Sequence, residues 1–372
     1  MDPPVQPGFY EPECLQGWRN HSTQQKASPM KQNPRVLGID LAKRIFHLVG
    51  MDDAGHVVLK KRLTREALLP FIAQLSPVVI GMEACGGAHY WARQFRAHGH
   101  TVKLIAPQFV KPYVKSNKND PADAEAICEA VTRPTMRFVP IKEVAQQDLQ
   151  SLHRARERVV KARTALVNEI RGLLAEYGII LPQSVTRFRH AFLATLEAER
   201  TKLTPLSMEL FEQLYEEFGV LEKRLAYYTD KIAAIGAAHP VCQRLMTVPG
   251  IGPLTATALV AAVSNATAFK NGRQLAAWIG LVPRQHSTGG KPRLLGISKR
   301  GDVYLRTLFV HGARATLRWI GLKTDRRSQW VRGLLDRRGK NKAAIALANK
   351  NARIAWVLLT TDQVYIPEQV VA

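Results

Sequence analysis

The chain has 372 residues, 46% of them hydrophobic, which is enough for two or three domains that each bury a core. Its 53 Lys and Arg residues outnumber 30 Asp and Glu residues, which gives a formal net charge of +23. This excess of cations indicates a polyanionic partner, above all nucleic acid, because basic side chains that neutralise phosphates release counterions. The alternative is a basic protein without such a partner.

Four cysteines, Cys14, Cys85, Cys128 and Cys242, are scattered along the chain. They form no CxxC pair, so the sequence argues against a zinc site and fits a reducing cytosol. No apolar run is long enough to span a bilayer and there is no N-terminal h-region, so we expect a cytoplasmic protein with no membrane partner. Residues 1–34 are rich in Pro, Gln, Asn and Ser, which predicts a poorly ordered extension.

The region 35–141 alternates between strand and helix patterns. Three apolar runs separated by turn residues predict two hairpins, and two more strands alternate with helices after them. Strands are expected at 36–42, 46–53, 56–64, 78–84 and 101–107, and helices at 65–74, 88–98 and 120–131. This order predicts an α/β domain with a mixed sheet and helices packed on it.

Strand signals vanish from about Lys142. Apolar residues then recur at steps of three or four from Leu149 to Leu173, and a stricter heptad pattern runs from Phe211 to Ile235. Two long helices joined by residues 178–205 would form an antiparallel coiled-coil arm over 142–237. Such an arm could mediate dimerisation, or it could be a helical hairpin that packs on its own domain, and the sequence does not separate the two.

The last region, 238–372, is predicted to be mostly helical, with glycine breaks and many basic residues. We expect a helix followed by a basic loop over 323–342 and a final helix over 343–360.

Four acidic residues stand out against this basic background. Asp40 interrupts the apolar strand "GIDLA", in its middle, and Glu83 ends the strand "VVIGME". A carboxylate among buried apolar residues is costly without a partner, and α/β proteins build their sites at strand ends. Asp120 and Asp123 fit the start of a helix, with Asp120 as the N-cap and Pro121 as the first helical residue.

Helix capping accounts for one acid of the pair Asp120 and Asp123, but it accounts less well for the presence of both. Spacing of three places both carboxylates on one face of the first turn. If they converge with Asp40 and Glu83, a divalent cation must neutralise them, and Mg²⁺ (or Mn²⁺) prefers such oxygen ligands. Two such ions about 4 Å apart can promote cleavage of a phosphodiester.

The segments "GIDLAK", "MEACGG" and "NDPADAEAI", in this order, resemble the DEDD motif of the RuvC-like domain in IS110-family transposases, most closely the IS1111 group. The stretches "VPGIGPLTATALVAAV" and "LAAWIGLVPRQHSTGGKPRLLGISKRGDVYLR" are similar to the second domain of that family. The resemblance covers residues 35–320. It implies an RNase H-like fold over 35–141 and a metal-binding tetrad of Asp40, Glu83, Asp120 and Asp123.

The resemblance also implies what the protein acts on. It implies a bacterial, nucleoid-associated recombinase that exchanges donor and target DNA, a structured noncoding RNA that guides it, and assembly into a dimer or tetramer. Composition and spacing alone give no sign of the RNA.

The segment "VPGIGP", 248–253, resembles a helix-hairpin-helix turn. Gly250 and Gly252 would let the backbone approach a phosphate, and the following helix would offer free N–H groups. The alternative is a plain turn between two helices.

The segment "QHSTGGKPRLLGISKRGD", 285–302, joins a serine to small residues and cations. Lys291, Arg293, Lys299 and Arg300 would bind phosphates and stabilise charge on them. The resemblance makes Ser287 the nucleophile of an "S-x-G" context. Ser298 and, less well, Thr288 are rivals, and Ser287 could also be a loop residue that only binds phosphate. "STGGK" is not a Walker loop, because Gln285 stands where the first glycine would.

Three functions therefore compete. The first is a recombinase that uses the metal-bound acids and Ser287. The second is a metal-dependent junction nuclease that uses the acids and water. The third is a non-catalytic nucleic-acid-binding protein whose acids are structural.

Overall fold

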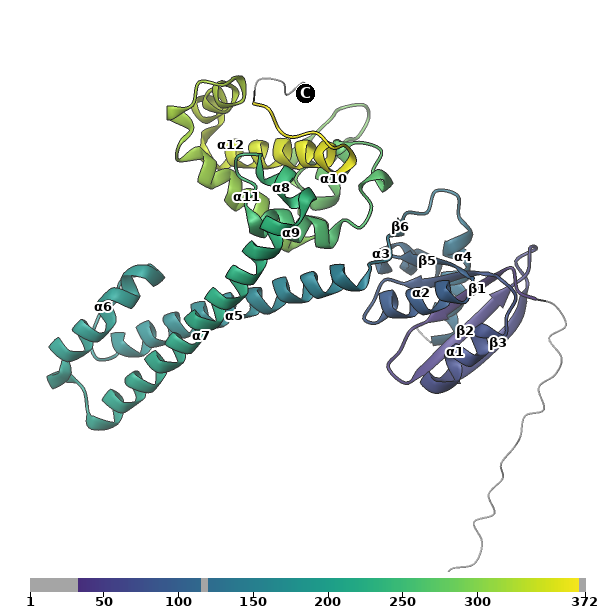
Figure 1. The fold of residues 1–372 in the computed structure, drawn as a ribbon, viewed down its shortest axis with the longest axis horizontal. Helices are drawn as coiled ribbons and strands as arrows, with labels where there is room; N and C mark the ends of the chain where they lie inside the picture. The colour runs from purple at the N-terminus through teal and green to yellow at the C-terminus, as the bar shows by residue number, and fades with distance from the viewer. Residues whose placement is uncertain (1–32, 115–119, 368–372) are drawn as a thin grey trace, which may run out of the picture.

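The computed structural model describes residues 33–114 and 120–367, so nearly all of the predicted extension at 1–34 lies outside the described residues. Three parts follow one another in Figure 1: an α/β unit, a long pair of helices, and a helical unit at the C-terminal end. Within the described part of the chain, no helix combines the length and apolar composition needed to cross a membrane.

The α/β unit contains one six-stranded sheet in the order β3-β2-β1-β4-β5-β6. β1, β2 and β3 form the two predicted hairpins, β4 and β5 run parallel to β1, and β6 pairs antiparallel with β5. The mixed sheet was predicted correctly. The elements are β1 Val36–Asp40, β2 Ile45–Met51, β3 Val57–Thr64, α1 Arg65–Ala73, β4 Val79–Glu83, α2 Ala88–Ala97, β5 Thr101–Ile105, α3 Pro107–Val110, η1 Lys111–Tyr113, α4 Asp120–Thr132 and β6 Phe138–Val139.

Helices cover both faces of this sheet. α1 and α2 bury Leu68, Ile72 and Phe95 against one face, whereas α4 buries Ala124 and Ile127 against the other. The pattern predicted helices packed on the sheet, and the structure makes the sheet the middle layer of a three-layer sandwich.

A glycine lets α4 lie close to the sheet. A side chain at Gly38 of β1 would collide with the carbonyl oxygen of Ala124 in α4. The backbone N–H of Gly38 instead donates to the Cys128 sulfur at 2.9 Å, and the Cys128 thiol donates to the Val49 carbonyl oxygen at 2.9 Å. These contacts hold the middle of α4 against β1 and β2.

Three details of the prediction for this unit were wrong. Asp40 is the last residue of β1 and not its middle, because residues 41–44 turn the chain back into β2. Helix α4 starts at Asp120, so Asp120 is its first residue and not the N-cap. The short elements α3 and β6 were not predicted.

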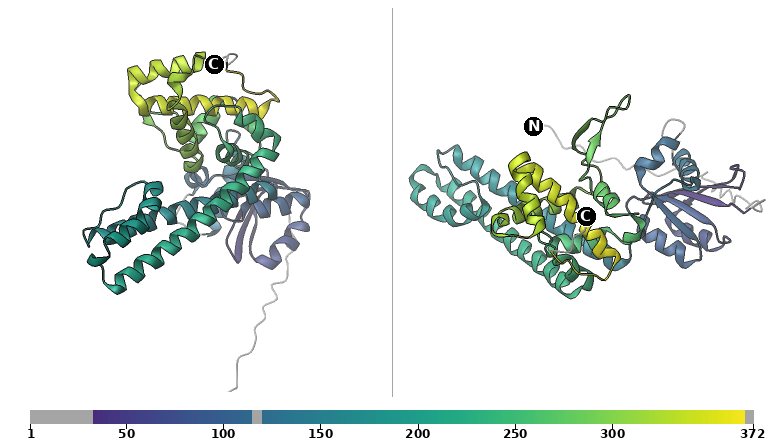
Figure 2. Two further views of the ribbon diagram at one scale, coloured as in Figure 1. Left: turned by 60° about the vertical axis from the view of Figure 1, so that its left-hand side comes forward. Right: turned by 90° about the horizontal axis from the view of Figure 1, so that it is seen from above.

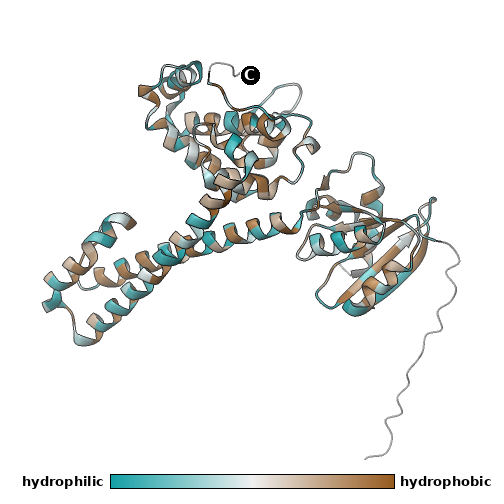
Figure 3. Ribbon diagram, viewed as in Figure 1, coloured by the Kyte–Doolittle hydropathy of each residue, from teal (hydrophilic) through white to brown (hydrophobic). Residues whose placement is uncertain are grey.

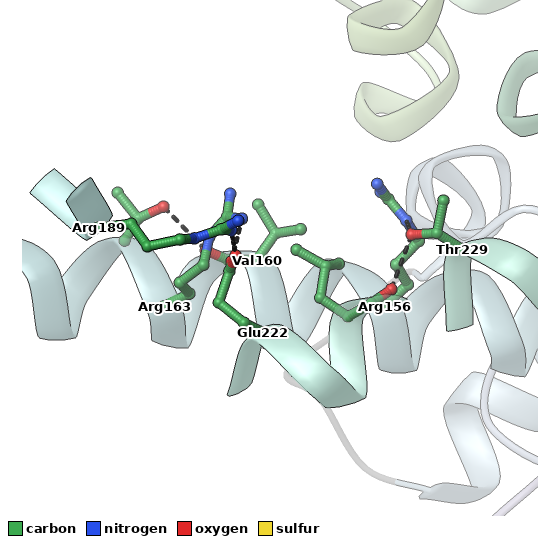
Figure 4. Close-up of polar contacts among 8 residues, drawn as sticks. Arg156, Val160, Arg163, Arg189, Glu222 and Thr229 are labelled. Atoms are coloured by element: carbon green, nitrogen blue, oxygen red, sulfur yellow. Dashed lines mark hydrogen bonds and ion pairs between the residues drawn. The ribbon is translucent and has the colours of Figure 1, made fainter. Parts of the chain in front are cut away.

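Two long antiparallel helices, α5 Val144–Ala175 and α7 Pro205–Ala238, form the arm. Arg163 of α5 donates to Glu222 of α7 at 2.6 Å, and Arg156 donates to Thr229 at 2.9 Å (Figure 4). The pairings step backward along α7 as they step forward along α5, which is what antiparallel helices require. Hydrophobic and hydrophilic residues alternate along both helices (Figure 3). A supercoil and a role in dimerisation stay predictions.

The connection at the far end of the arm contains a helix that the sequence analysis missed, α6 Val185–Ala198, followed by η2 Arg200–Lys202. Its Phe188 and Phe192 pack in one cluster with Phe211 and Phe218 of α7. Arg189 of α6 also pairs with Glu222 (Figure 4).

The C-terminal unit is mostly helical, as predicted, and has its own core. It also contains a β-hairpin, so the expectation of no strands beyond Lys142 was wrong. Its elements are α8 Pro240–Met246, α9 Pro253–Ala262, η3 Ala266–Ala268, α10 Gly272–Ile279, β7 Pro283–Gln285, β8 Leu294–Ile297, α11 Val303–Leu317, η4 Ile320–Leu322 and α12 Arg326–Thr360. Instead of the predicted basic loop, α12 has a sharp kink at Gly339, whose φ is 75°.

The first turns of α5 join the outer units. Arg93 of α2 donates to the Lys142 carbonyl oxygen at 2.6 Å just before α5 begins. His153, buried within α5, hydrogen-bonds Thr257 of α9 and Tyr304 of α11, both at 2.9 Å. The arm is thus anchored at its root to the C-terminal unit by a polar contact.

Candidate functional site

Asp40 and Glu83 lie side by side at the carboxyl edge of the sheet. β1 and β4 are parallel, and the last pair in their register is Ile39 with Met82, so the next residues, Asp40 and Glu83, end the two strands at the same level. Adjacent strands in register point equivalent side chains to the same face. Both carboxylates are partly buried.

The face on which they lie is the one covered by α4. Gly38 and Gly81 are two residues before Asp40 and Glu83, and they contact α4. Because side chains alternate along a strand, the two acids project from the same face as these glycines. The first turn of α4 directly precedes the turns that meet these glycines.

Asp123 and the backbone of Asp120 belong to that first turn. Ala124 and Ile127 face the sheet and are buried. Position 120 is four residues before Ala124, and Asp123 is four residues before Ile127, so both positions continue the sheet-facing stripe of α4. Asp123 is partly buried, and the side chain of Asp120 lies outside the described residues.

The charges of the two strand-end acids affect the pKa of a neighbouring thiol. Burial raises the pKa of the Cys85 thiol, and the carboxylates of Glu83 and Asp40 raise that pKa further. A thiolate at Cys85 would be repelled by both acids, so both lie close to it.

These acids offer the oxygen ligands that Mg²⁺ or Mn²⁺ takes, and they share one face and one edge of the sheet. Among the described residues, which exclude the side chain of Asp120, no three potential ligands already converge tightly enough to hold a metal ion. The donor set therefore fits a divalent cation chemically, and a site would require the carboxylates to close around it.

Two further polar residues lie in the same row across the sheet, and the sequence analysis did not predict them. His47 of β2 is the cross-strand partner of Asp40, and Arg62 of β3 is the partner of His47. Directly opposed residues share a face, so a histidine and an arginine flank the acids. Only the strand register reveals them, because nothing in the spacing of residues 40, 47 and 62 marks them as neighbours.

Ser287 lies near the tip of the hairpin formed by β7 and β8. The segment pairs His286 with Arg293 and Thr288 with Lys291, and Gly289 and Gly290 both have positive φ, as a tight two-residue hairpin turn requires. Ser287 is exposed, and its hydroxyl oxygen accepts a hydrogen bond from the Gln285 side chain at 2.8 Å. In Figure 2, right, the hairpin, in green, stands out from the C-terminal helices.

The base of the hairpin is held firmly. The buried Arg306 of α11 donates to the carbonyl oxygens of Ile279 at 2.9 Å and Arg300 at 3.0 Å. Ser298 lies at this base, partly buried, and its backbone N–H donates to Val282 at 2.7 Å. Its position in the rigid base makes Ser298 less accessible to a large substrate than Ser287.

Cations surround the hairpin without acids among them. Lys291, Arg293, Lys299 and Arg300 are all exposed, and residues 283–301 include no Asp or Glu. Lys299 has a φ of 55°, a left-handed conformation that is uncommon outside glycine. This part of the surface is well suited to phosphate groups.

The two glycines of the "VPGIGP" turn have different surroundings. Gly250, with a φ of 95°, packs against α11, where a side chain would lie 2.9 Å from the Gly312 carbonyl oxygen. Gly252 is exposed, precedes α9, and has open space where a side chain would be. Only Gly252 is therefore placed so that a phosphate could approach its backbone.

The chain matches two models of transposase families. One, described as transposase, matches residues 37–179, and the other, described as transposase of the IS116/IS110/IS902 family, matches residues 242–329. The chain is 53% identical over 332 residues to a probable family 20 transposase of Pseudomonas aeruginosa, covering 89% of this chain and 98% of that protein.

Two further relatives are transposases of insertion sequences. The transposase for insertion sequence element IS1111A of Coxiella burnetii is 46% identical over 98% of this chain and 99% of its own length. The transposase for insertion sequence element IS1328 of Yersinia enterocolitica is 42% identical over 90% of this chain and 99% of its own length. The chain therefore belongs to the IS110 family of insertion-sequence transposases and is similar to the IS1111 members of that family.

Proposed function

We propose that the protein is a recombinase that cuts and rejoins DNA strands at the ends of an insertion sequence, using Asp40, Glu83, Asp120 and Asp123 as ligands of divalent cations and Ser287 as the nucleophile. The observation that carries this proposal is the shared level and face of Asp40 and Glu83, on the side of the sheet that α4 covers. A RuvC-like fold of the α/β unit is part of the proposal.

The four carboxylates have one task in this scheme. They bind Mg²⁺ or Mn²⁺, which when bound supplies a Lewis acid for the phosphodiester oxygens. Without the cation the acids would repel one another, so closure of the carboxylates depends on the bound cation.

Ser287 performs the strand exchange. Its Oγ attacks the phosphorus, the new Oγ–P bond replaces one P–O bond of the strand, and the displaced oxygen takes up a proton as the serine loses one. The phosphodiester is conserved as a serine ester, so rejoining needs no ATP. The cations beside the hairpin stabilise the charge that develops on the phosphate.

The acids and the serine belong to different units of the chain. A hydroxyl attacks poorly unless a base or a metal activates it. The hairpin that carries Ser287 and the carboxylates must therefore meet at the same phosphate of the DNA. Either the units close on the DNA, or the serine of one chain meets the acids of a second chain in a dimer or tetramer.

A noncoding RNA as guide is also part of the proposal. The net charge of +23 suits a complex in which one protein binds both RNA and DNA. A discrete RNA that copurifies with the protein would support this assignment, and purification free of any defined RNA would contradict it.

The test is a search for a covalent adduct between the protein and DNA that carries the ends of the insertion sequence, in the presence of Mg²⁺. The adduct is expected in the wild type and in Ser298→Ala, and it should be lost in Ser287→Ala and in Asp40→Asn. An equal yield of adduct in Ser287→Ala would show the serine assignment to be wrong.

A junction nuclease is the second candidate, because Ser287 projects on a hairpin from a different unit than the acids. It would nick DNA with Mg²⁺ and water and form no adduct, and Ser287→Ala would nick normally. If neither the wild type nor Asp40→Asn nicks or joins DNA in Mg²⁺, neither candidate stands and the protein only binds nucleic acid.

A further inference from the structure

A groove of about 1520 Å³ lies in the C-terminal unit, away from the acids of the sheet. Strand β8 of the Ser287 hairpin forms one wall, with Leu294–Ile297. The kinked helix α12 and residues 363–366 also line the groove. The volume exceeds the roughly 300–1,000 Å³ typical of sites for a single small molecule, so the groove suits an extended ligand.

The groove is lined by cations without counterions. Arg273, Lys342, Lys350 and Arg353 line it, and the described lining includes no Asp or Glu. Burial lowers the pKa of the Lys350 ammonium, and the neighbouring cations, among them Arg353, lower it further. An anionic ligand would relieve this repulsion, so charge favours a polyanion.

The rest of the lining is apolar, aromatic and amide. Trp330 is 36% exposed, and the Lys350 ammonium lies 4.9 Å from its ring centroid, which helps to orient the indole. Leu294 is 65% exposed, and the side-chain amides of Asn271 and Asn341 line the same groove. Aromatic and apolar surface beside cations fits a strand with accessible bases, whereas a duplex hides its base faces.

A second copy of this chain fits the groove less well. In a symmetric dimer the same patch meets itself, so four cations would face four cations. Juxtaposed like charges cost several kilocalories per mole, and the groove has no acids to compensate them.

We infer that this groove binds unpaired nucleotides of a single-stranded nucleic acid, with a base stacked against Trp330 and phosphates bound by Lys342, Lys350 and Arg353. The groove adjoins the hairpin, because Gln285 pairs with Leu294 and Ser287 is only two residues beyond. Two residues of strand span about 7 Å. A strand held in the groove would therefore present its next phosphates near Ser287.

The experiment measures binding to short fluorescent oligonucleotides of four to six nucleotides by anisotropy, with the full-length protein. Single-stranded DNA and single-stranded RNA of one sequence form two arms, and a longer duplex forms the third. Trp330→Ala should weaken binding of the single strands roughly tenfold, and Trp330→Phe should bind within about twofold of the wild type, because stacking needs an aromatic face. Trp319→Ala, which removes a tryptophan 65% exposed outside the groove, is the matched control and should bind normally.

The cations are tested by the salt dependence of single-strand binding. The double variant Lys342→Gln and Arg353→Gln should lower the slope of log K against log salt by about 1.4, or about 0.7 for each lost phosphate contact. The double variant Lys223→Gln and Arg224→Gln on the exposed surface of α7 removes the same charge and should leave the slope unchanged. Thermal melting of each variant checks that it is folded.

Comparison of the affinities for single-stranded DNA and single-stranded RNA identifies which of the two the groove prefers. A loss of affinity in Trp330→Ala that is confined to single strands supports the inference, whichever of the two is preferred. Equal binding by Trp330→Ala and the wild type would overturn it, and so would an equal loss for duplex and single strands. A change of oligomeric mass in sedimentation, with binding of oligonucleotides unchanged, would instead make the groove a protein interface. Binding needs no catalysis, so failure of the Ser287 assignment would not affect these results.

Discussion

Asp40 and Glu83 end neighbouring parallel strands at the same level of one sheet, one position beyond the pair of Ile39 and Met82. They are 43 positions apart in the sequence. The parallel register of β1 and β4 brings them together, and the glycines that precede them by two positions allow α4 to cover the same face. The central site thus depends on the sheet, and the following predictions test it and its surroundings.

Asp123→Asn should abolish strand cleavage and leave the fold nearly intact. The substitution keeps the shape of the side chain and removes one of several like charges, so the melting temperature of the metal-free protein should stay level or rise slightly. Thermal melting and a cleavage assay with Mg²⁺ on the same sample check both parts. A large fall in melting temperature would instead identify Asp123 as a residue that mainly stabilises the start of α4.

Asp40→Asn should lower the pKa of the Cys85 thiol. Burial and the charges of Glu83 and Asp40 raise this pKa above 9.0, and the substitution removes one of these charges. The rate of alkylation of Cys85 against pH, followed by mass spectrometry, measures the change. Asp52→Asn, in the turn after β2, is the control and should not change the dependence of the alkylation rate on pH. An unchanged dependence in Asp40→Asn would place Asp40 away from the thiol.

Acidification from pH 7 to pH 4 should loosen the joint between the arm and the C-terminal unit. Burial, and secondarily the charge of Arg156, lowers the pKa of His153 from 6.5 to about 4. His153 takes up a proton near pH 6.5 in the unfolded chain and only near pH 4 in the folded chain. The contribution of neutral His153 to stability is therefore fully present above pH 6.5 and is lost as the pH falls from 6.5 to 4. The loss should be about 3 kcal/mol at 1.36 kcal/mol for each pKa unit.

His153 must be neutral to keep both of its hydrogen bonds as they are. The Thr257 hydroxyl donates to the Pro253 carbonyl oxygen at 2.6 Å, so it accepts from Nε2 of His153, and Nδ1 accepts from the Tyr304 hydroxyl. His153→Gln should reduce the dependence of unfolding on pH. His89, whose pKa is also lowered to about 4, should account for much of the remainder. Chemical denaturation at several pH values measures this, and an unchanged slope in His153→Gln would contradict it.

Glu222→Gln should destabilise the far half of the arm by about 2 kcal/mol, between the values for exposed and buried ion pairs. The substitution leaves Arg163 and Arg189 without their shared carboxylate (Figure 4). Hydrogen exchange should speed up in α6 and in the facing turns of α5 and α7. The exposed Glu217→Gln is the matched control; equal exchange in both variants would show that the pair contributes little.

Gly252→Ala and Gly312→Ala should behave in opposite ways. Gly252 has open space and a φ of −97°, so an added methyl group should leave the stability within about 1 kcal/mol of the wild type. A methyl group at Gly312 would collide with the carbonyl oxygen of Gly250, so this variant should unfold more easily. Thermal melting compares them. If Gly252→Ala also weakens binding of duplex DNA, the turn contacts phosphate, and if binding is unchanged it is a plain turn.

Most strands and helices of the α/β unit could be predicted from the sequence, because buried strands bounded by turn residues and helices with clear ends give strong local signals. The order of the strands was not predicted from the sequence. The proximity of Asp40 and Glu83 was expected from the place of Glu83 at a strand end and from resemblance to a family, and the parallel register of β1 and β4 produces it. The neighbours His47 and Arg62 could not be predicted, since cross-strand register depends on the whole sheet.

The hairpin that carries Ser287 was missed for a different reason. Its strands have three and four residues, and nearly all of their side chains are exposed, so they lack the alternation of buried and exposed residues that marks a strand. Its turn requires two residues with positive φ, and the pair Gly289 and Gly290 is the signal that could have found it. Helix α6 was hidden similarly, because its apolar face is defined by the arm that it packs on.

We propose above that the carboxylates at the edge of the sheet bind divalent cations together. The most direct measurement is anomalous diffraction at the manganese edge from crystals of the protein soaked in Mn²⁺. We expect a manganese peak contacted by carboxylate oxygens of Asp40, Glu83 and Asp123, which disappears in Glu83→Gln. Saturating Mn²⁺ with no peak at this edge, or a peak that persists unchanged without the Glu83 carboxylate, would contradict it.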